Sequence, residues 1–310
     1  MGDRLKGKVA VVTGAGRGLG RCHALALAAE GAKLVINDLG GAVDGSGADK
    51  SPADEVVAEI GKMGGEAVAN YDSVVTMEGG EKIIKAAIDN FGRLDILVNN
   101  AGVLRDRMVF NMTEEEWDAI MAVHLKGHFT CTKFACTIFR QQQSGRIVNT
   151  SSPAGLGNMG QANYSAAKEG IVGFTRTVAR DMGRYGVTCN VIRPRAATRL
   201  TVTPELKAAW EKRAAQGLAG AGSGMASMPV LPPPEAVSPL VIFLCTDEAA
   251  NINGRDFIVG GGVIDLLADP TNMRAIYKDG IWTVDELCEV VPKSLAAGLE
   301  NRFAPQVKQS

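Results

Sequence analysis

The chain has 310 residues, a formal net charge of −1 and a hydrophobic content of 46%. Such a balanced charge lacks the basic excess of a nucleic-acid-binding surface, so nucleic acid is not expected as a partner. No apolar stretch approaches the roughly 20 residues of a membrane span, and the charged start Met1–Lys8 lacks the apolar run of a signal peptide. The six cysteines are scattered and form no C-x-x-C pair. We therefore expect a cytoplasmic protein with reduced thiols, no metal and no membrane partner.

Short β-branched runs alternate with longer helical patterns over the first two thirds of the chain. Most of the short runs are continuously apolar, which is typical of parallel strands buried on both faces. Strands are predicted at Val9–Thr13, Leu34–Asn37, Ala67–Asn70, Ile96–Asn100, Arg146–Ser151, Thr188–Ile192 and Phe257–Val259. Helices are predicted at Gly18–Glu30, Pro52–Met63, Gly79–Phe91, Glu114–Gln141, Tyr164–Tyr185 and Pro234–Cys245. This alternation predicts an α/β fold with a doubly wound parallel sheet and helices on both faces.

Two regions depart from this alternation. Gly217–Pro234 is rich in Gly, Ala, Ser, Met and Pro, a composition that resists packing; a lid over a substrate cleft and a surface insertion are both compatible with it. The tail holds a T-x-x-E capping box at Thr283, apolar residues at helical spacing, and Pro292, which is expected to kink or split the helix. We predict one domain over residues 1–264, with a substrate loop at 195–235. Residues 265–310 are predicted to form an extension packed on the domain or on a neighbouring subunit.

A glycine-rich turn follows the first predicted strand and leads into a helix. Its sequence is Thr13-Gly14-Ala15-Gly16-Arg17-Gly18-Leu19-Gly20. Glycine is needed because the turn is tight and the backbone must approach a pyrophosphate closely. The helix N-terminus supplies free N–H groups and a partial positive charge for that anion. The turn predicts a dinucleotide site built from Gly14, Arg17, Gly18 and Leu19, although its spacing is G-x-x-x-G-x-G rather than G-x-G-x-x-G.

Acidic residues close the second and third predicted strands. Asp38 can hydrogen-bond the adenosine ribose hydroxyls and repel a 2′-phosphate, which favours NAD over NADP. Arg17 is an opposing signal because a guanidinium can reach a 2′-phosphate; the alternative for Arg17 is a solvated surface residue. Asp72 and Ser73 lie where a carboxylate can meet the adenine amino group, and plain turn residues are the alternative. We predict NAD as the cofactor.

Tyr164 and Lys168 are four residues apart in a predicted helix and therefore share one face. A free phenol, with a pKa of about 10, is a poor base at neutral pH. A nearby ammonium and the positive nicotinamide of an oxidised cofactor favour the phenolate and lower its pKa. The pair thus predicts an acid/base for alcohol–ketone interconversion. Ser151 and Ser152 close the fifth strand, where a hydroxyl can hold the substrate oxygen; Ser152 is preferred and Ser151 stays open.

Taken together, these motifs resemble the short-chain dehydrogenase/reductase family over roughly residues 5–265. The matching elements are the turn at Thr13–Gly20, Asn99-Asn100-Ala101-Gly102 after the fourth strand, Ser152, and Tyr164-x-x-x-Lys168. The resemblance implies one Rossmann domain with a seven-stranded sheet and Tyr164 as proton donor or acceptor. It also implies that Ser152 orients the substrate oxygen and Lys168 binds the nicotinamide ribose. Cofactor contacts are further expected from Tyr164, Asn100, Ala101 and Gly102.

His124 stands where the family usually carries an asparagine that completes a water-mediated proton relay with the lysine. Imidazole can also relay protons, and the alternative is a histidine held by backbone carbonyls. His124, Asn37–Gly41, Ala69–Val74, Leu104–Arg107 and Gly160–Lys168 are similar to one branch, the dehydrogenase units of peroxisomal multifunctional enzymes of type 2. That branch oxidises (3R)-hydroxyacyl-CoA to 3-ketoacyl-CoA with NAD. The similarity fades beyond about Thr201, where substrate choice would be decided.

The leading functional prediction is an NAD-dependent (3R)-3-hydroxyacyl-CoA dehydrogenase. Cationic Arg193, Arg195 and Arg199 after the sixth strand are candidates for the phosphates of CoA, or are plain surface residues. A hydroxysteroid or other secondary-alcohol dehydrogenase, with an apolar cleft lined by Gly224–Val230, is the second hypothesis. The third is a non-catalytic NAD-binding regulator. The family resemblance further implies a homodimer or homotetramer joined through Glu114–Gln141 and Tyr164–Tyr185.

Overall fold

The computed structural model describes residues 2–198 and 231–301. These residues form a sheet of eight strands in the order β3-β2-β1-β4-β5-β6-β7-β8. The strands are β1 (Val9–Thr13), β2 (Lys33–Asn37), β3 (Ala67–Asn70), β4 (Ile96–Asn99), β5 (Gly145–Thr150), β6 (Val187–Pro194), β7 (Asp256–Gly260) and β8 (Val263–Leu266). The strand order reverses between β1 and β4, which are parallel neighbours. Ligands of such sheets bind at the carboxyl ends of the two strands that flank this reversal.

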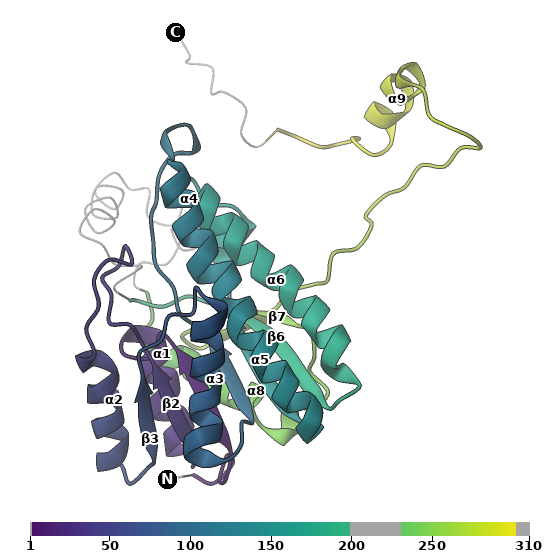
Figure 1. Ribbon diagram of the computed structural model, residues 1–310. Coiled ribbons are helices and arrows are strands. Elements are labelled where there is room, and N and C mark those ends of the chain that lie inside the picture. The colour runs from purple at the N-terminus through teal and green to yellow at the C-terminus, as the bar shows by residue number, and fades with distance from the viewer. Residues whose placement is uncertain (1, 199–230, 302–310) are drawn as a thin grey trace. The chain divides into compact units, whose positions relative to one another are not determined.

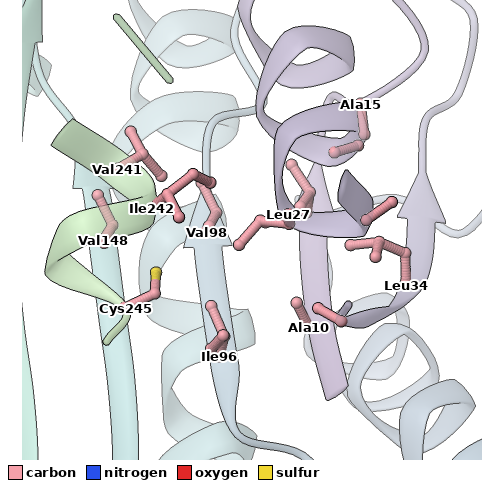
Figure 2. Packing of buried hydrophobic residues seen from close by; sticks show 14 of the residues in the cluster. Ala10, Ala15, Leu27, Leu34, Ile96, Val98, Val148, Val241, Ile242 and Cys245 are labelled. Atoms are coloured by element: carbon pink, nitrogen blue, oxygen red, sulfur yellow. The ribbon is translucent and has the colours of Figure 1, made fainter. Parts of the chain in front are cut away.

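The helices cover both faces of the sheet (Figure 1), which confirms the predicted fold class. Successive residues of β1 point to opposite faces, so Ala10 and Val12 join one hydrophobic cluster and Val9 and Val11 join the other. The first cluster includes residues of α1 (Gly18–Ala29), α2 (Ser51–Lys62) and α8 (Ser238–Leu244). The second includes residues of α3 (Met77–Phe91), α5 (Gly127–Gln142) and α6 (Ala162–Gly183). Figure 2 shows α8 laying Val241 and Ile242 over the central strands.

The eighth strand differs from the seven-stranded sheet that the family resemblance implied. β8 pairs antiparallel with β7, and Gly260 faces Val263 across the two-residue turn Gly261-Gly262. Gly261 has a positive φ of 60°, which glycine adopts without strain. All four β8 residues are exposed, so the strand lacks the buried apolar run used to find the others. The Gly-Gly pair between two β-like segments was the available signal.

The predicted helix Glu114–Gln141 is interrupted. The structure has α4 (Glu114–Ile120), a π-helical turn over Met121–Lys126, and then α5. Thr113 and Glu116 form the predicted capping box at the start of α4. A π turn inserts one residue into the helical repeat without ending the helix, and such turns are frequent at functional sites.

The chain divides into two compact units, Met1–Leu267 and Ala268–Ser310, and β8 belongs to the first. In the second unit, α9 (Val284–Val290) begins at the Thr283–Glu286 capping box, as predicted. It is followed by a 3₁₀ turn, Val291–Lys293, that contains Pro292. Arg274 donates from Nη1 to the carbonyls of Ser294, Leu295 and Ala297 within this unit. Within the described ranges, no helix is long and apolar enough to cross a membrane.

Candidate active site

Gly14 and Gly20, in the turn after β1, lie too close to neighbouring backbone to be replaced by residues with side chains. Gly14 has a φ of 62°, and a Cβ there would lie 2.7 Å from the Cα of Ala101. A Cβ on Gly20 would lie 2.1 Å from the carbonyl oxygen of Gly14. Gly18 also has a positive φ, 54°, where α1 begins. The turn therefore brings bare backbone to the N-terminus of α1, as a site for a pyrophosphate requires.

Thr13 and Asn100 fasten this turn to the end of β4. The backbone N–H groups of Asn100 and Ala101 donate to Thr13 Oγ1 at 3.0 and 3.1 Å. In return, Asn100 Nδ2 donates to the carbonyls of Thr13 and Gly14, both at 3.1 Å. The carboxyl ends of β1 and β4 are thus held in a fixed geometry at the switch point.

The carboxylate of Asp38 is held by backbone donors on both oxygens. Gly16 N donates to Oδ2 at 2.7 Å, and Gly40 N donates to Oδ1 at 2.6 Å. Each oxygen keeps lone-pair capacity for a further donor. Asp72 is oriented in a similar way by Asn70, whose Nδ2 donates to Asp72 Oδ2 at 2.8 Å. The protein itself therefore orients the carboxylates of Asp38 and Asp72, without the help of a ligand.

These elements enclose a cavity of about 280 Å³ at the carboxyl ends of β1, β2 and β4. The cofactor residues named from the sequence that line it are Gly14, Arg17, Gly18, Leu19, Asp38, Asp72, Ser73, Asn100, Ala101 and Gly102. Sequence reasoning missed the lining residues of the segment after β2, which are Leu39, Gly41, Ala42, Gly45 and Gly47, as well as Val103 and Val123. Four glycines in the eight residues that follow Leu39 were the available signal for close backbone approach.

Arg17 lies near a carboxylate of its own chain. Its positive charge helps to lower the pKa of Asp49, although the largest contributions there are hydrogen bonds from Ser51.

Tyr164 and Lys168 project from the first turns of α6. Lys168 is buried, and its Nζ lies 5.5 Å from the centroid of the Tyr164 ring. The same Nζ donates to the carbonyl of Thr150, the last residue of β5, at 2.6 Å. This hydrogen bond holds the Lys168 ammonium beside the Tyr164 ring. Neither residue lines the cavity described above, but both adjoin it through His124, which packs against Gly102.

The structure brings Ser152, rather than Ser151, to the tyrosine. Ser151 is buried and donates its hydroxyl to the carbonyl of Lys168 at 2.7 Å. Ser152 lies in the loop after β5, accepts from Ala154 N at 3.1 Å, and hydrogen-bonds the Tyr164 hydroxyl, which partly offsets the rise in pKa of that phenol.

Burial shifts both members of the Tyr164–Lys168 pair toward their neutral forms. Burial raises the pKa of Tyr164 to about 12, helped by the negative charge of Asp106. Burial also lowers the pKa of Lys168 to about 7. The protein alone therefore does not produce the lowered phenol pKa expected from the sequence, because desolvation is the largest influence on this phenol. A positive charge beside Tyr164 would lower the pKa of this phenol.

His124 sits in the π turn, edge-on to Tyr164, with the ring centroids 5.1 Å apart. Its Nε2 lies 2.8 Å from the carbonyl oxygen of Val103 and 3.2 Å from the backbone nitrogen of the same residue. The shorter contact, to the carbonyl, favours the ring proton on Nε2. Its Nδ1 is then a buried acceptor, and no partner for it exists in the described part of the chain. Burial, together with the charge of Lys168, lowers the pKa of His124 well below its usual value. The histidine is thus neutral and offers one lone pair toward the interior of the site.

Arg193 is a structural residue and not a ligand for the phosphates of CoA. Its side chain is 1% exposed, and it donates to both carboxylate oxygens of Asp256, at 2.8 to 3.0 Å. It also donates to Glu169 at 2.8 Å and to the carbonyl of Ser152 at 3.0 Å. Sequence position alone had made it a phosphate candidate, and burial rules that out. Arg199 and most of the predicted substrate loop, residues 199–230, lie outside the described residues, as does Gly224–Val230.

The cavity at the switch point and the Ser–Tyr–Lys group beside it define a nicotinamide-dependent oxidoreductase that acts on hydroxyl groups. The family model described as short chain dehydrogenase matches residues 8–209. The chain therefore belongs to the short-chain dehydrogenase/reductase family.

Relatives extend this match to nearly the whole chain. The chain is 43% identical to hydroxyacyl-CoA dehydrogenase ChsB1 of Mycobacterium tuberculosis, over 97% of this chain and 90% of that one. It is 46% identical to the peroxisomal multifunctional enzyme type 2 of Mus musculus over 89% of this chain, which spans about a third (34%) of that longer protein. A crystal structure of a short chain dehydrogenase from Mycobacterium avium is 44% identical, with a TM-score of 0.79 and coverage of 94% of this chain and 96% of that one.

Proposed function

We propose that this chain is an NAD-dependent dehydrogenase that converts (3R)-3-hydroxyacyl-CoA to 3-ketoacyl-CoA. The observation that carries the proposal is the 43% identity, over 97% of the chain, to a hydroxyacyl-CoA dehydrogenase. The similarity to the peroxisomal type 2 enzymes supports the same substrate class. The R configuration rests on the residues shared with that branch, above all Gly160–Lys168 and His124.

Two features of the cavity support NAD over NADP. The Asp38 carboxylate is held at the end of β2 by the backbone of Gly16 and Gly40, where it can accept from ribose hydroxyls and repel a 2′-phosphate. Arg17, the residue able to attract that phosphate, lies in the field of Asp49. Both effects disfavour a second negative charge on the ribose.

The residues present fit a dinucleotide. A Cβ at Gly14 or Gly20 would collide with the backbone of Ala101 or of Gly14, so the turn stays bare where it meets the N-terminus of α1, which suits a pyrophosphate. Asp38 would hold the adenosine ribose and Asp72 the adenine amino group. Lys168 would hold the nicotinamide ribose, next to Asn100, Ala101 and Gly102. The bound cofactor supplies the acceptor for the substrate's hydride.

The proton of the substrate alcohol is handled by side chains of α6 and the β5 loop. Ser152 would hold the substrate oxygen, and the Tyr164 phenolate would take the proton during oxidation. Lys168 stabilises the phenolate only in its charged form, so its low pKa makes the pair sensitive to pH near 7. The Nδ1 of His124 would accept from a water that links it to Lys168, in place of the usual asparagine.

We also propose a homodimer or homotetramer. A surface cavity on the α4–α6 side of the molecule is lined by apolar Met121, Leu125, Phe129 and Phe174. Phe129 is 44% exposed. Large exposed apolar side chains on facing helices are typical of subunit contacts, and this is the surface through which the family resemblance predicts association.

The proposal is tested by following reduction of NAD and of NADP with matched (3R)- and (3S)-hydroxyacyl-CoA. Turnover of the R isomer with NAD, and little with the S isomer or with NADP, is expected. No turnover of either isomer, together with turnover of hydroxysteroids or simple secondary alcohols, would support a hydroxysteroid or secondary-alcohol dehydrogenase instead. Tyr164→Phe should bind NAD normally and turn over no substrate. A wild-type chain that binds NAD but is inactive on every alcohol would favour the redox-sensing regulator.

A further inference from the structure

The segment between β2 and α2, residues 39–50, forms a wall of the cofactor cavity; we call it the cap segment. Five of its residues line the cavity: Leu39, Gly41, Ala42, Gly45 and Gly47. Its fold is defined by backbone hydrogen bonds from Asp49 N to the carbonyl of Leu39, at 2.9 Å, and from Ala42 N to the carbonyl of Ser46, at 2.8 Å. Because the segment starts directly after Asp38, it borders the part of the cavity that suits adenosine.

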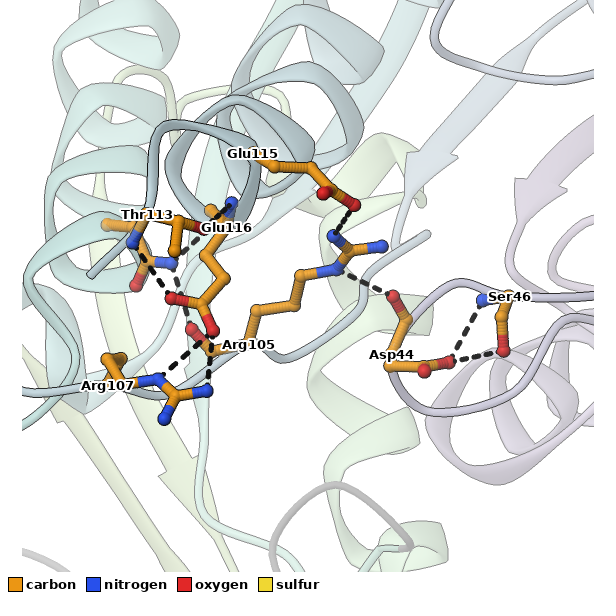
Figure 3. A network of polar contacts seen from close by, with 8 residues as sticks. Asp44, Ser46, Arg105, Arg107, Thr113, Glu115 and Glu116 are labelled. Atoms are coloured by element: carbon orange, nitrogen blue, oxygen red, sulfur yellow. Dashed lines mark hydrogen bonds and ion pairs between the residues drawn. The ribbon is translucent and has the colours of Figure 1, made fainter. Parts of the chain in front are cut away.

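The tip of the cap segment is hydrogen-bonded to the loop that follows β4. Leu104 N donates to the carbonyl of Val43 at 2.9 Å. Arg105 Nε donates to the carbonyl of Asp44 at 3.1 Å. Figure 3 shows the Arg105 guanidinium between Asp44 and Glu115 of α4, whose Oε1 accepts from Nη1 at 3.0 Å. One side chain thus joins the cap segment to the start of α4.

The backbone of Arg105 is tied to the catalytic helix. Its carbonyl accepts from Nδ2 of Asn163 at 3.0 Å, and Asn163 is fully buried. Asn163 Oδ1 in turn accepts from the backbone N–H of Tyr164 at 2.8 Å. Arg105, which contacts the cap segment, is therefore hydrogen-bonded to the residue directly before Tyr164, the proposed acid/base.

Arg107 provides an internal comparison two residues further along the chain. Its Nε and Nη2 donate to Glu116 Oε1 at 3.1 and 2.9 Å. It thus pairs with the same turn of α4 as Arg105, but its guanidinium is directed to Glu116 and not to Asp44 (Figure 3). The two arginines differ mainly in the contact with the cap segment.

We propose that Arg105 is a positioning residue that holds the cap segment closed over the adenosine half of a bound dinucleotide. This inference rests on the cofactor proposed above. Without the guanidinium, the tip keeps the backbone bond to Leu104 but loses its side-chain tie to α4. A hydrogen bond from a charged donor in a partly exposed setting corresponds to a change of about five- to tenfold in affinity.

The test compares Arg105→Gln with Arg107→Gln in the full-length protein by calorimetric titration. Arg105→Gln should raise the Kd of NAD and of ADP-ribose by the same factor, about five- to tenfold, because ADP-ribose keeps the adenosine half and lacks only the nicotinamide. Arg107→Gln should leave both values within about twofold. The kcat of Arg105→Gln at saturating NAD should also stay within about twofold of wild type, because the catalytic side chains are untouched.

Limited trypsin digestion gives a second readout that is local to the cap segment, and Arg107→Gln controls for a general loss of stability. Bound NAD should protect the bond after Lys50 in wild type and in Arg107→Gln, and protect it less in Arg105→Gln at equal saturation. Unchanged NAD affinity in Arg105→Gln overturns the proposal, and so does an equal loss in both variants. If wild type binds neither NAD nor ADP-ribose, the cofactor assignment fails first and the role of Arg105 falls with it.

Discussion

All three histidines of the chain are buried, which makes the fold sensitive to mild acid. His23, His124 and His128 are 0%, 1% and 2% exposed. Burial lowers the pKa of His23 to about 4 and that of His128 to about 3. The pKa of His124 is also lowered well below its usual value, by burial and by the charge of Lys168. Below about pH 6.5 the unfolded chain therefore binds protons that the native chain does not.

The sign and size of this effect follow from the shifts. Because the unfolded state binds more protons, the free energy of unfolding falls as pH decreases from about 7 toward 4. Between pH 7 and pH 5 the loss is about 2 kcal/mol for each of His23 and His128, and His124 acts in the same direction. A typical domain has only about 5–15 kcal/mol of stability, so the loss is large enough to measure.

Urea unfolding at pH 7 and pH 5, at one fixed protein concentration, measures the loss. His23→Asn serves as the matched variant. His23 Nδ1 contacts Ser238 Oγ at 2.9 Å, and an asparagine amide can keep this hydrogen bond. His23 is also far in sequence from Ser152, Tyr164 and Lys168. Its pH-dependent loss should be smaller than that of wild type by about 2 kcal/mol, whatever its stability at pH 7. An unfolding free energy that is equal at the two pH values, or a variant with the same loss as wild type, would refute the reasoning.

Four substitutions test the site and the buried ion pair beside it. Ser152→Ala should lower kcat by about a hundredfold or more in steady-state assays, whereas Ser151→Ala, which removes a bond to the Lys168 carbonyl, should cost stability more than rate. Asp38→Asn should raise the NADP/NAD ratio of kcat/KM at least about tenfold, because a charge repelling the 2′-phosphate is removed. Arg193→Met leaves Asp256 buried without its cation and should cost about 3–5 kcal/mol in urea unfolding.

Each of these expectations has a clear contrary result. A larger kcat loss in Ser151→Ala than in Ser152→Ala would move the substrate oxygen to the other hydroxyl. An unchanged cofactor ratio in Asp38→Asn would mean that selection depends on other residues. A double variant, Arg193→Met with Asp256→Leu, should recover much of the lost stability, because no unpaired charge is left in the core. If the double variant does not regain stability, the loss in Arg193→Met comes mainly from the contacts of Arg193 with Glu169 and Ser152.

Continuous apolar runs were the most reliable sequence signal. Val9–Thr13 was predicted to the residue, because a parallel strand buried on both faces allows few polar side chains. The half-buried edge strand Ala67–Asn70 was also predicted to the residue. The exposed strand β8 carries no such constraint and was missed. The role of Arg193 could not be predicted either, since its partners Glu169 and Asp256 meet it only through the packing of β6, β7 and α6. Sequence position suggests which end of a strand a side chain occupies, not whether it points into the core.

The π turn explains how a histidine fits where the family usually has asparagine. A Cβ on Gly102 would lie 2.6 Å from Cε1 of His124, so the imidazole occupies space that the absence of a side chain at Gly102 leaves free. The extra residue in the helical turn and that glycine together admit a larger ring beside Tyr164. Because its pKa is lowered well below the usual value, His124 cannot share the cationic role of Lys168. In the proposed mechanism its contribution to proton transfer would be limited to the acceptor lone pair on Nδ1, and the charge that stabilises the phenolate would come from Lys168 and the bound cofactor.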